Sequence, residues 1–125
     1  MAEDRFVTKL ENRQQISITV IGRRSGRKIT LPVWFVAADA ALWLLPVHGS
    51  RTQWYRNLLT NPAITIKAGS EGRALRARAL KDARAVRKVI RWFGEKYKPE
   101  MIARLYPGPL DVAVKVRLGT PPKAE

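Results

Sequence analysis

The chain has 125 residues, of which 46% are hydrophobic and 27% are charged, a balance that predicts one globular domain, residues 1–125, with a packed core. It contains no cysteine and one histidine, which excludes disulfide scaffolds, thiolate nucleophiles and Cys/His zinc sites, so no metal is expected. Lys and Arg number 24 against 10 Asp and Glu, a net charge of +14 that predicts an anionic ligand and contact with anionic surfaces.

The amino-terminal residues Met1 to Asp4 are polar and acidic and lack the apolar segment of a secretory signal. A cytoplasmic location is therefore expected. Residues 31–47 carry one charge, but Pro32 and Pro46 lie within them, and the segment is short for a bilayer span. We interpret it as a β-hairpin that turns at Ala38 to Ala40.

Six segments have the alternation or the β-branched and aromatic composition of strands. The predicted strands cover residues 16–21, 29–37, 42–47, 64–68, 73–80 and 112–117. In residues 73–80 the Ala and Leu side chains are expected to face inward and the Arg side chains outward. Residues 1–12 are predicted to form an arm or a short helix, and residues 119–125 a flexible tail.

Two helices are predicted between these strands. Residues 51–61 form the first, with Trp54, Leu58, Tyr55 and Leu59 as candidate inward side chains, and Asn61-Pro62 ends it. Asp82 caps the second and longest helix, whose buried face follows the 3.6-residue period. That face carries Val86, Val89, Ile90, Phe93 and Tyr97, and a further turn of helix is expected over residues 101–106.

The order of these elements shows no strand and helix alternation of the kind that builds a parallel sheet. We therefore predict an α+β fold with mainly β content. About six antiparallel strands with two or three helices close most economically into a small barrel, because closure leaves few exposed edges.

Acid and base candidates are few in this chain. The ten carboxylates form no spacing that indicates a general acid and base pair. His48 lies two residues from Ser50, but without a nucleophile-elbow pattern a serine hydrolase is disfavoured. We interpret His48 as a loop residue that lines a pocket.

Two segments have the composition of an anion site. The turn from Gly22 to Lys28 places two glycines, Ser25 and four cations between strands, which exposes backbone donors next to positive charge. The segment from Pro46 to Asn57 combines a strand end, a glycine-containing loop and a helix amino terminus. Trp54 and Tyr55 are candidates both for stacking on a planar ring and for core packing.

These two segments together resemble the deazaflavin (F420)-dependent nitroreductase and quinone reductase family. The resemblance rests on Gly22-Arg23-Arg24-Ser25-Gly26, Pro32-Val33-Trp34-Phe35-Val36, Trp54-Tyr55-Arg56-Asn57-Leu58 and Asn61-Pro62, in that order. It implies a split β-barrel related to flavin-binding pyridoxamine phosphate oxidases. It also implies hydride transfer from reduced F420 to a small acceptor such as a quinone or a nitro compound, and a homodimer.

The resemblance also implies which residues bind the cofactor. Arg24, Ser25 and Gly26 would hold the phosphate or the acidic tail, Val47, His48 and Gly49 would lie against the ring system, and Trp54 and Asn57 would complete the pocket. The same site would include Arg27, Lys28, Pro32, Pro46 and Arg51. Two positions differ from the family pattern, since Ile29 stands at a frequent Arg and His48 at a frequent Lys.

Other interpretations stay open at this point. FMN is the alternative cofactor, and a cofactor-free barrel is a further possibility. A basic β-barrel that binds nucleic acid through phosphate contacts and stacking also fits the charge. However, the sequence has no nucleic-acid-binding motif and its Trp residues lie in apolar runs, so no specific nucleic acid partner is expected.

Overall fold

The computed structural model describes residues 6, 9–10, 13–106 and 110–118. Its six strands form a closed antiparallel barrel in the order β1-β2-β3-β6-β5-β4, and β4 pairs with β1 to close it. The strands are β1 (Gln15–Ile21), β2 (Lys28–Ala38), β3 (Ala41–Leu44), β4 (Ala63–Ala68), β5 (Glu71–Leu80) and β6 (Ala113–Arg117). The predicted α+β barrel is confirmed.

Two long strands connect the two halves of the barrel. The first part of β2 pairs with β1, from Lys28 opposite Ile21 to Trp34 opposite Gln15, and its last part pairs with β3. In the same way β5 pairs first with β4 and then with β6. Each long strand therefore belongs to two sheets, which is the arrangement of a split barrel.

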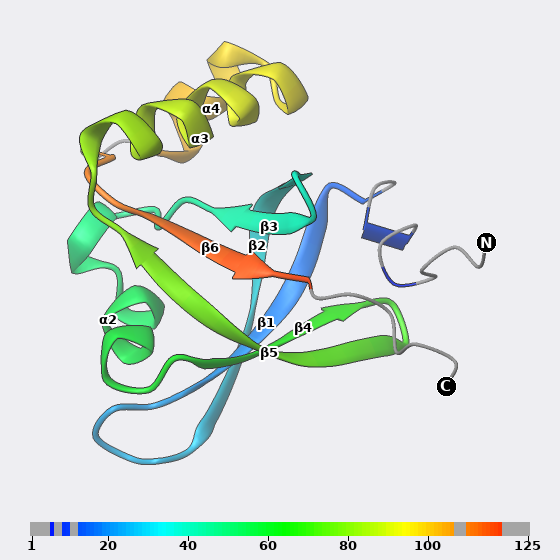
Figure 1. The fold of residues 1–125 in the computed structure, drawn as a ribbon, viewed down its shortest axis with the longest axis vertical. Helices are drawn as coiled ribbons and strands as arrows, with labels where there is room; N and C mark the ends of the chain where they lie inside the picture. Colours follow the sequence, from blue (N-terminus) through cyan, green and yellow to red (C-terminus); the bar gives the residue numbers. More distant parts are fainter. Residues whose placement is uncertain (1–5, 7–8, 11–12, 107–109, 119–125) are drawn as a thin grey trace.

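In the described part of the chain after residue 13, helical segments lie at two places around this barrel. A short 3-10 turn (Gly49–Arg51) precedes α2 (Gln53–Thr60), and α3 (Ala83–Lys96) precedes α4 (Pro99–Leu105). Asp82 caps α3 as predicted, because its carboxylate accepts a hydrogen bond from the Ala85 N–H at 3.0 Å. In Figure 1, α3 and α4 lie together at one end of the molecule, and the turn between β1 and β2 projects at the other.

The buried residues form two clusters on opposite sides of the β3 and β6 sheet. One fills the barrel interior and includes Ile18, Phe35, Leu44, Ile66 and Val114. The other lies between the outer face of that sheet and the two helices, and its members include Val36, Trp43, Val89, Phe93 and Tyr97. The predicted buried face of α3 is confirmed for Val86, Val89, Phe93 and Tyr97, while Ile90 is partly buried.

Several sequence-based expectations differ from the structure. The second strand of the hairpin ends at Leu44 rather than Val47, and the 3-10 turn and α2 replace one helix over residues 51–61. Leu59 is 51% exposed, because the buried face of α2 consists of Trp54, Tyr55, Asn57 and Leu58. Arg73 faces inward and its guanidinium lies 4.6 Å from the centroid of the Phe6 ring. On a strand it shares a face with Leu75 and cannot share one with Arg76.

The predictions at the chain ends fall mostly outside the described residues. The tail at 119–125 lies wholly outside them, and so do residues 107–109. Of the predicted arm, Phe6, Lys9 and Leu10 are described and helical, and Phe6 and Leu10 are buried in the barrel cluster. Among the described residues, no helix is long and apolar enough to cross a membrane.

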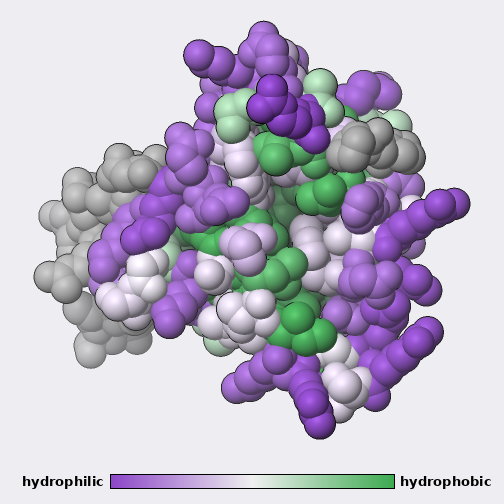
Figure 2. All heavy atoms as spheres, turned by 180° about the vertical axis from the view of Figure 1, so that it is seen from behind, coloured by the Kyte–Doolittle hydropathy of each residue, from purple (hydrophilic) through white to green (hydrophobic). Residues whose placement is uncertain are grey.

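The face of the molecule that lies behind the view of Figure 1 carries both hydrophilic and hydrophobic side chains. Seen from behind, hydrophobic side chains gather in the middle of the face and hydrophilic ones border them (Figure 2). The large apolar side chains that are exposed in the described residues are Ile29, Val47, Leu59 and Met101.

Tyr97 fixes α3 to the barrel. Its buried hydroxyl accepts a hydrogen bond from the Phe35 N–H at 3.2 Å and lies 2.8 Å from the carbonyl oxygens of Gln14 and Phe35. Burial raises the pKa of Tyr97 to about 12, against an opposing effect of the Phe35 hydrogen bond. The phenol is therefore a neutral donor at physiological pH.

We expect Tyr97→Phe to lower the free energy of unfolding by about 1–3 kcal/mol, because the buried Phe35 N–H loses the Tyr97 hydroxyl as its acceptor. Urea unfolding measures this change. Tyr106→Phe is the control, since the Tyr106 hydroxyl has no hydrogen bond within the described part of the chain. Equal losses in the two variants would contradict the role of the Tyr97 hydroxyl.

Lys96 makes stability depend on pH. Its ammonium donates to the Phe35 carbonyl at 2.9 Å and lies 3.5 Å from the centre of the Phe35 ring. Burial lowers the pKa of Lys96 from 10.5 to about 8. Between these two values the unfolded chain binds more protons than the folded one, so the free energy of unfolding rises with pH across this window.

We expect this rise from about pH 8 to about pH 10.5 in chemical unfolding of the wild type, and its loss in Lys96→Met. Lys98→Met, which removes an exposed cation nearby, should keep it. A wild-type curve that falls across the window would show that Lys96 does not control it.

Candidate functional site

The turn between β1 and β2 has a defined backbone geometry. The Gly22 N–H donates to the Arg27 carbonyl at 2.8 Å, and the Gly26 N–H donates to the Gly22 carbonyl at 2.9 Å. Gly26 has a φ of 71°, a conformation that favours glycine. The Ser25 hydroxyl oxygen accepts from the Arg27 N–H at 3.1 Å. The turn therefore presents Arg24, Ser25 and Arg27 to solvent on a closed loop.

Arg23 attaches this turn to α2. The Asn57 side-chain oxygen accepts from the Arg23 backbone N–H at 3.1 Å and from its guanidinium at 2.8 Å. A second guanidinium nitrogen donates to the Gln53 side-chain oxygen at 2.8 Å. Loss of solvation, followed by the repulsion of Arg56 and Arg24, lowers the pKa of Arg23. We call these three residues the Arg23 clamp.

A hollow of about 330 Å³ lies between the turn and α2. Its lining includes the turn backbone, three clamp residues, Ser25 and one apolar side chain, and the full set is Gly22, Arg23, Arg24, Ser25, Ile29, Gln53 and Asn57. Ile29 is opposite the buried Val20 in the strand register, so it lies on the inner face of the sheet at the barrel end. The hollow therefore combines an apolar wall with exposed cations and donors.

The loop before α2 is held by two polar contacts. The Thr52 hydroxyl oxygen accepts from the His48 N–H at 2.8 Å. The Asp111 carboxylate accepts from the Ser50 N–H at 2.9 Å and from the Ser50 hydroxyl at 2.8 Å. The Ser50 hydroxyl hydrogen bond is the main cause of the lowered pKa of Asp111. Since Ser50 donates to Asp111 and not to His48, these residues do not form a hydrolase pair.

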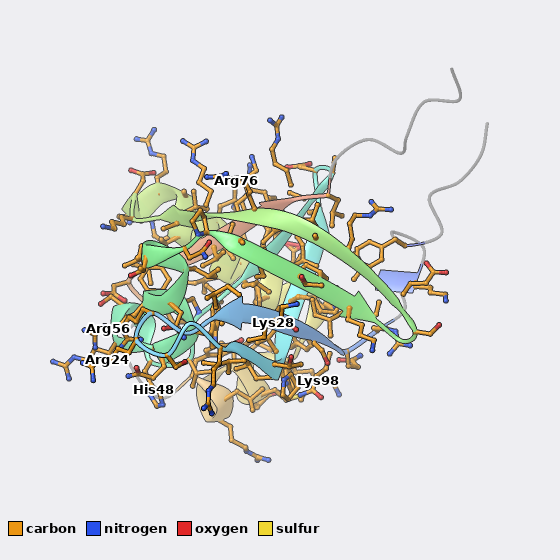
Figure 3. All side chains as sticks on the ribbon, turned by 90° about the horizontal axis from the view of Figure 1, so that it is seen from below. Arg24, Lys28, His48, Arg56, Arg76 and Lys98 are labelled. Carbon is orange, nitrogen blue, oxygen red and sulfur yellow. The ribbon has the colours of Figure 1, made fainter. Side chains whose placement is uncertain are left out.

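The predicted loop residues differ in accessibility. Val47, His48 and Arg51 are exposed, whereas Pro46 and Gly49 are buried. Gly49 has a φ of 58°, which only glycine adopts without strain at this turn. In Figure 3, His48 is seen at the same end of the molecule as Arg24 and Arg56.

The structure brings together only part of the predicted site. Arg24, Ser25 and Asn57 line the hollow, and Gly26 and Arg27 complete the adjoining turn. Lys28 and Pro32 are exposed on β2 but do not line the hollow, because they alternate with the inward-facing Ile29 and Leu31. Trp54 is 6% exposed and packs in the barrel core. Trp54 is therefore a core residue and does not line the hollow, contrary to the prediction.

Sequence reasoning missed Arg23 and Gln53. The sequence groups Arg23 with the exposed cations of the turn, yet its guanidinium donates hydrogen bonds to Asn57 and Gln53. Gln53 and Asn57 lie four residues apart on one face of α2, a spacing that could have indicated a shared partner. Only the approach of the turn to the helix shows that the partner is Arg23.

The chemistry available at this site is binding rather than proton transfer. The hollow has no carboxylate or imidazole in its lining. No group of three metal-ligating side chains occurs in the described residues. The exposed donors and the Ile29 wall suit a ligand with an anionic part and a planar apolar part.

A family model for F420H(2)-dependent quinone reductases matches residues 2–98. The chain belongs to this family. It is therefore an F420H2-dependent reductase. A comparison with the sequences of curated proteins gave no match.

Solved structures support the fold. An F420-H2 dependent reductase (FDR-A) superposes with a TM-score of 0.65 at 21% identity, covering 83% of this chain and 94% of that one. The heme storage protein HutZ from Vibrio cholerae gives 0.71 at 18% identity, with 93% and 89% covered. A structure described as a domain-swapped dimer gives 0.66 at 22% identity, with 83% and 80% covered. The expected split barrel is thereby confirmed.

We expect Asn57→Ala to lower the free energy of unfolding by about 1–3 kcal/mol, because the Arg23 N–H and guanidinium lose their shared acceptor. Arg24→Gln is the matched control, since Arg24 is exposed on the same turn and has no partner in the described residues. Thermal unfolding compares the two. A loss in Arg24→Gln as large as that in Asn57→Ala would rule out the clamp as the stabilising contact.

Proposed function

We propose that the protein binds F420 at the hollow between the β1–β2 turn and α2, and reduces a small acceptor such as a quinone or a nitro compound. The observation that carries this proposal is the Arg23 clamp, which holds a cation-bearing turn against a helix beside an apolar wall. Quinones are the preferred acceptor class, because the matching family is described as quinone reductases.

The residues present fit the two parts of F420, a planar deazaflavin and a chain with a phosphate and an acidic tail. Arg24, Ser25 and Arg27 offer exposed donors for the phosphate, and the turn geometry keeps their backbone groups fixed. Ile29 and Val47 supply exposed apolar surface for the ring. Arg51 and Arg56, both exposed, are the candidates for the tail.

Reduced F420 supplies the hydride when it is bound, so the role of the chain is to orient and to shield. Positioning of two reactants is among the largest contributions that a protein makes to such a reaction. Gly49 and Thr52 hold the His48 loop in one conformation, and His48 stays exposed beside it.

The proposal includes a homodimer. A structural neighbour is described as a domain-swapped dimer. On this chain, the hydrophobic area seen in Figure 2 offers an apolar surface on a molecule with a net charge of +14. A symmetric contact there would bury apolar side chains and would not involve the cations on the outer face of β5 and β6.

FMN is the alternative ligand, because its phosphate would also find donors at Arg24 and Ser25. The exposed cations beyond the turn favour F420, whose tail carries further negative charge. The comparison that separates them is a fluorescence titration with each cofactor at about 0.15 M salt. Tighter binding of FMN than of F420 would contradict the proposal.

We expect the double variant Arg24→Gln, Ser25→Ala to weaken F420 binding by about 10- to 100-fold, as removal of charge-assisted hydrogen bonds predicts. Arg104→Gln, on α4 and away from the turn, is the charge-matched control and should bind as the wild type does. Circular dichroism verifies that both variants are folded. Unchanged affinity of the double variant would place the phosphate elsewhere.

A further inference from the structure

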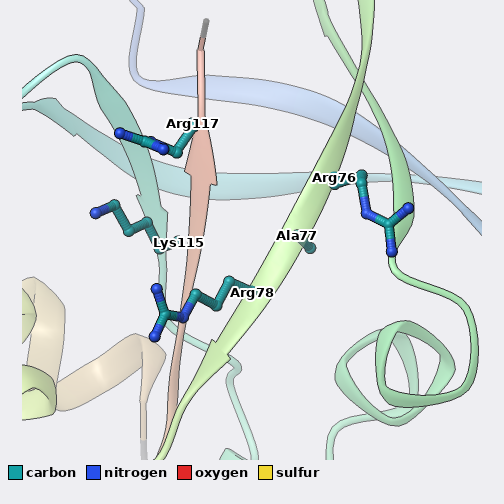
Figure 4. Close-up of a pocket in the computed structure, with 5 residues that line it drawn as sticks. All are labelled: Arg76, Ala77, Arg78, Lys115 and Arg117. Carbon is teal, nitrogen blue, oxygen red and sulfur yellow. The ribbon is translucent and has the colours of Figure 1, made fainter.

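Four cations line a second hollow, of about 500 Å³, on the outer face of β5 and β6. Its lining consists of Arg76, Ala77, Arg78, Lys115 and Arg117. Figure 4 shows Arg78, Lys115 and Arg117 extending to the same side of the strands, while Arg76 extends to the side where α2 lies. We call Arg78, Lys115 and Arg117 the strand cations.

The strand cations lie next to one another without compensation. Arg78 and Lys115 are directly opposite in the antiparallel register, and Arg117 follows Lys115 on the same face. Like charges opposite each other destabilise a sheet. In the described part of the chain none of the three forms an ion pair. The Lys115 ammonium packs over the Trp43 ring, but within the described residues no carboxylate offsets the repulsion among the three cations, so a bound anion would relieve it.

The basic surface continues from the sheet onto α3. Lys115 lies 5.1 Å from the Trp43 ring centre, the Trp43 and Trp92 rings are 5.1 Å apart, and Lys88 lies 4.9 Å from the Trp92 ring. Beyond Lys88, the exposed face of α3 has a hollow lined only by cations, namely Arg84, Arg87, Lys88 and Arg91. The strand cations and these four residues are together called the basic face.

We propose that the basic face docks the protein on an anionic phospholipid surface. Each Lys or Arg near such a surface contributes favourable electrostatic energy, and seven cations act together here. The apolar side of α3 packs on the barrel through Val86, Val89 and Phe93, so the helix has no free apolar face to insert. Docking is therefore peripheral and electrostatic, and it is sensitive to salt.

The chemistry of the basic face favours phospholipid over nucleic acid. Single-stranded nucleic acid is bound by cations together with exposed aromatic rings on which bases stack. The aromatic side chains of this face are Trp43, which is 8% exposed, and Trp92, which is partly buried against it. Lys115 and Lys88 lie over these rings, so the face offers many cations and little aromatic surface for stacking.

Docking would bring the enzyme to its acceptor. This consequence of docking rests on the proposed function. Quinones with long side chains dissolve in the bilayer, so a reductase held at the lipid surface meets them where they are concentrated. The basic face and the F420 hollow share no lining residue. Four cations line the β5–β6 hollow. Two of them, Lys115 and Arg117, lie beyond the residues that the family model matches.

The experiment is co-sedimentation of the full chain with vesicles at about 0.1 M salt. One set contains equal parts of phosphatidylglycerol and phosphatidylcholine, and the other contains phosphatidylcholine alone. We expect binding to the first set only. The triple variant Arg78→Gln, Lys115→Gln, Arg117→Gln should bind on the order of 100-fold more weakly, since each cation near an anionic surface contributes about five-fold.

A matched variant tests whether position matters or only net charge. The triple variant Lys67→Gln, Lys98→Gln, Arg104→Gln removes three exposed cations outside the basic face and should keep most of the affinity. Equal losses in the two triple variants would overturn the proposal. So would wild-type binding to phosphatidylcholine alone, or tighter binding to a mixed-sequence oligonucleotide than to the anionic vesicles.

Titration with F420 separates this proposal from the proposed function. The strand-cation variant should bind F420 as the wild type does, and the Arg24→Gln, Ser25→Ala variant should bind anionic vesicles as the wild type does. Loss of vesicle binding with intact F420 binding supports the docking face. Loss of F420 binding in the strand-cation variant would show that the strand cations belong to the cofactor site. That result would overturn the docking proposal.

Discussion

The structure depends on the continuity of β2 and β5 through both halves of the barrel. Each strand pairs with one neighbour along its first part and with another along its last part. This constraint fixes what lies at each end. The start of β2 extends to the turn that carries Arg24 and Ser25, and the end of β5 leads directly into the α3 cap. The proposed cofactor site and the helical cover are therefore positioned by the same two strands.

Backbone pairing alone does not hold the β1–β2 turn against α2, because the turn extends past the last register pair at Ile21 and Lys28. The Arg23 clamp supplies the missing connection. It places a buried acceptor, the Asn57 side chain, opposite a guanidinium that is itself close to Arg24 and Arg56. The repulsion among these three cations is tolerated because Asn57 and Gln53 bind one of them. A bound anion would relieve it further, which gives the turn a physical reason to accept one.

Alternation of apolar residues was enough to predict the barrel, because burial on one face of a strand leaves a clear two-residue period. It failed where the two faces of one strand have similar composition. In β5, Arg73 and Arg76 look equivalent in sequence, yet an odd separation directs one toward Phe6 and the other to solvent. The F420 site was predicted for the turn from a resemblance, and the clamp was not, since a contact between residues 30 or more positions apart leaves no local signal.

The distribution of charge constrains how such a molecule can assemble. With a net charge of +14, two copies repel each other unless their contact excludes the cation-rich surfaces. The β5–β6 sheet face is unsuited to a symmetric contact, because Arg78 and Lys115 already oppose each other within one copy. A contact through the hydrophobic area of Figure 2 would not add to this repulsion between cations. A dimer formed there would keep the basic face of each subunit exposed, so self-association and attraction to an anionic surface are compatible only when they use different faces of the barrel.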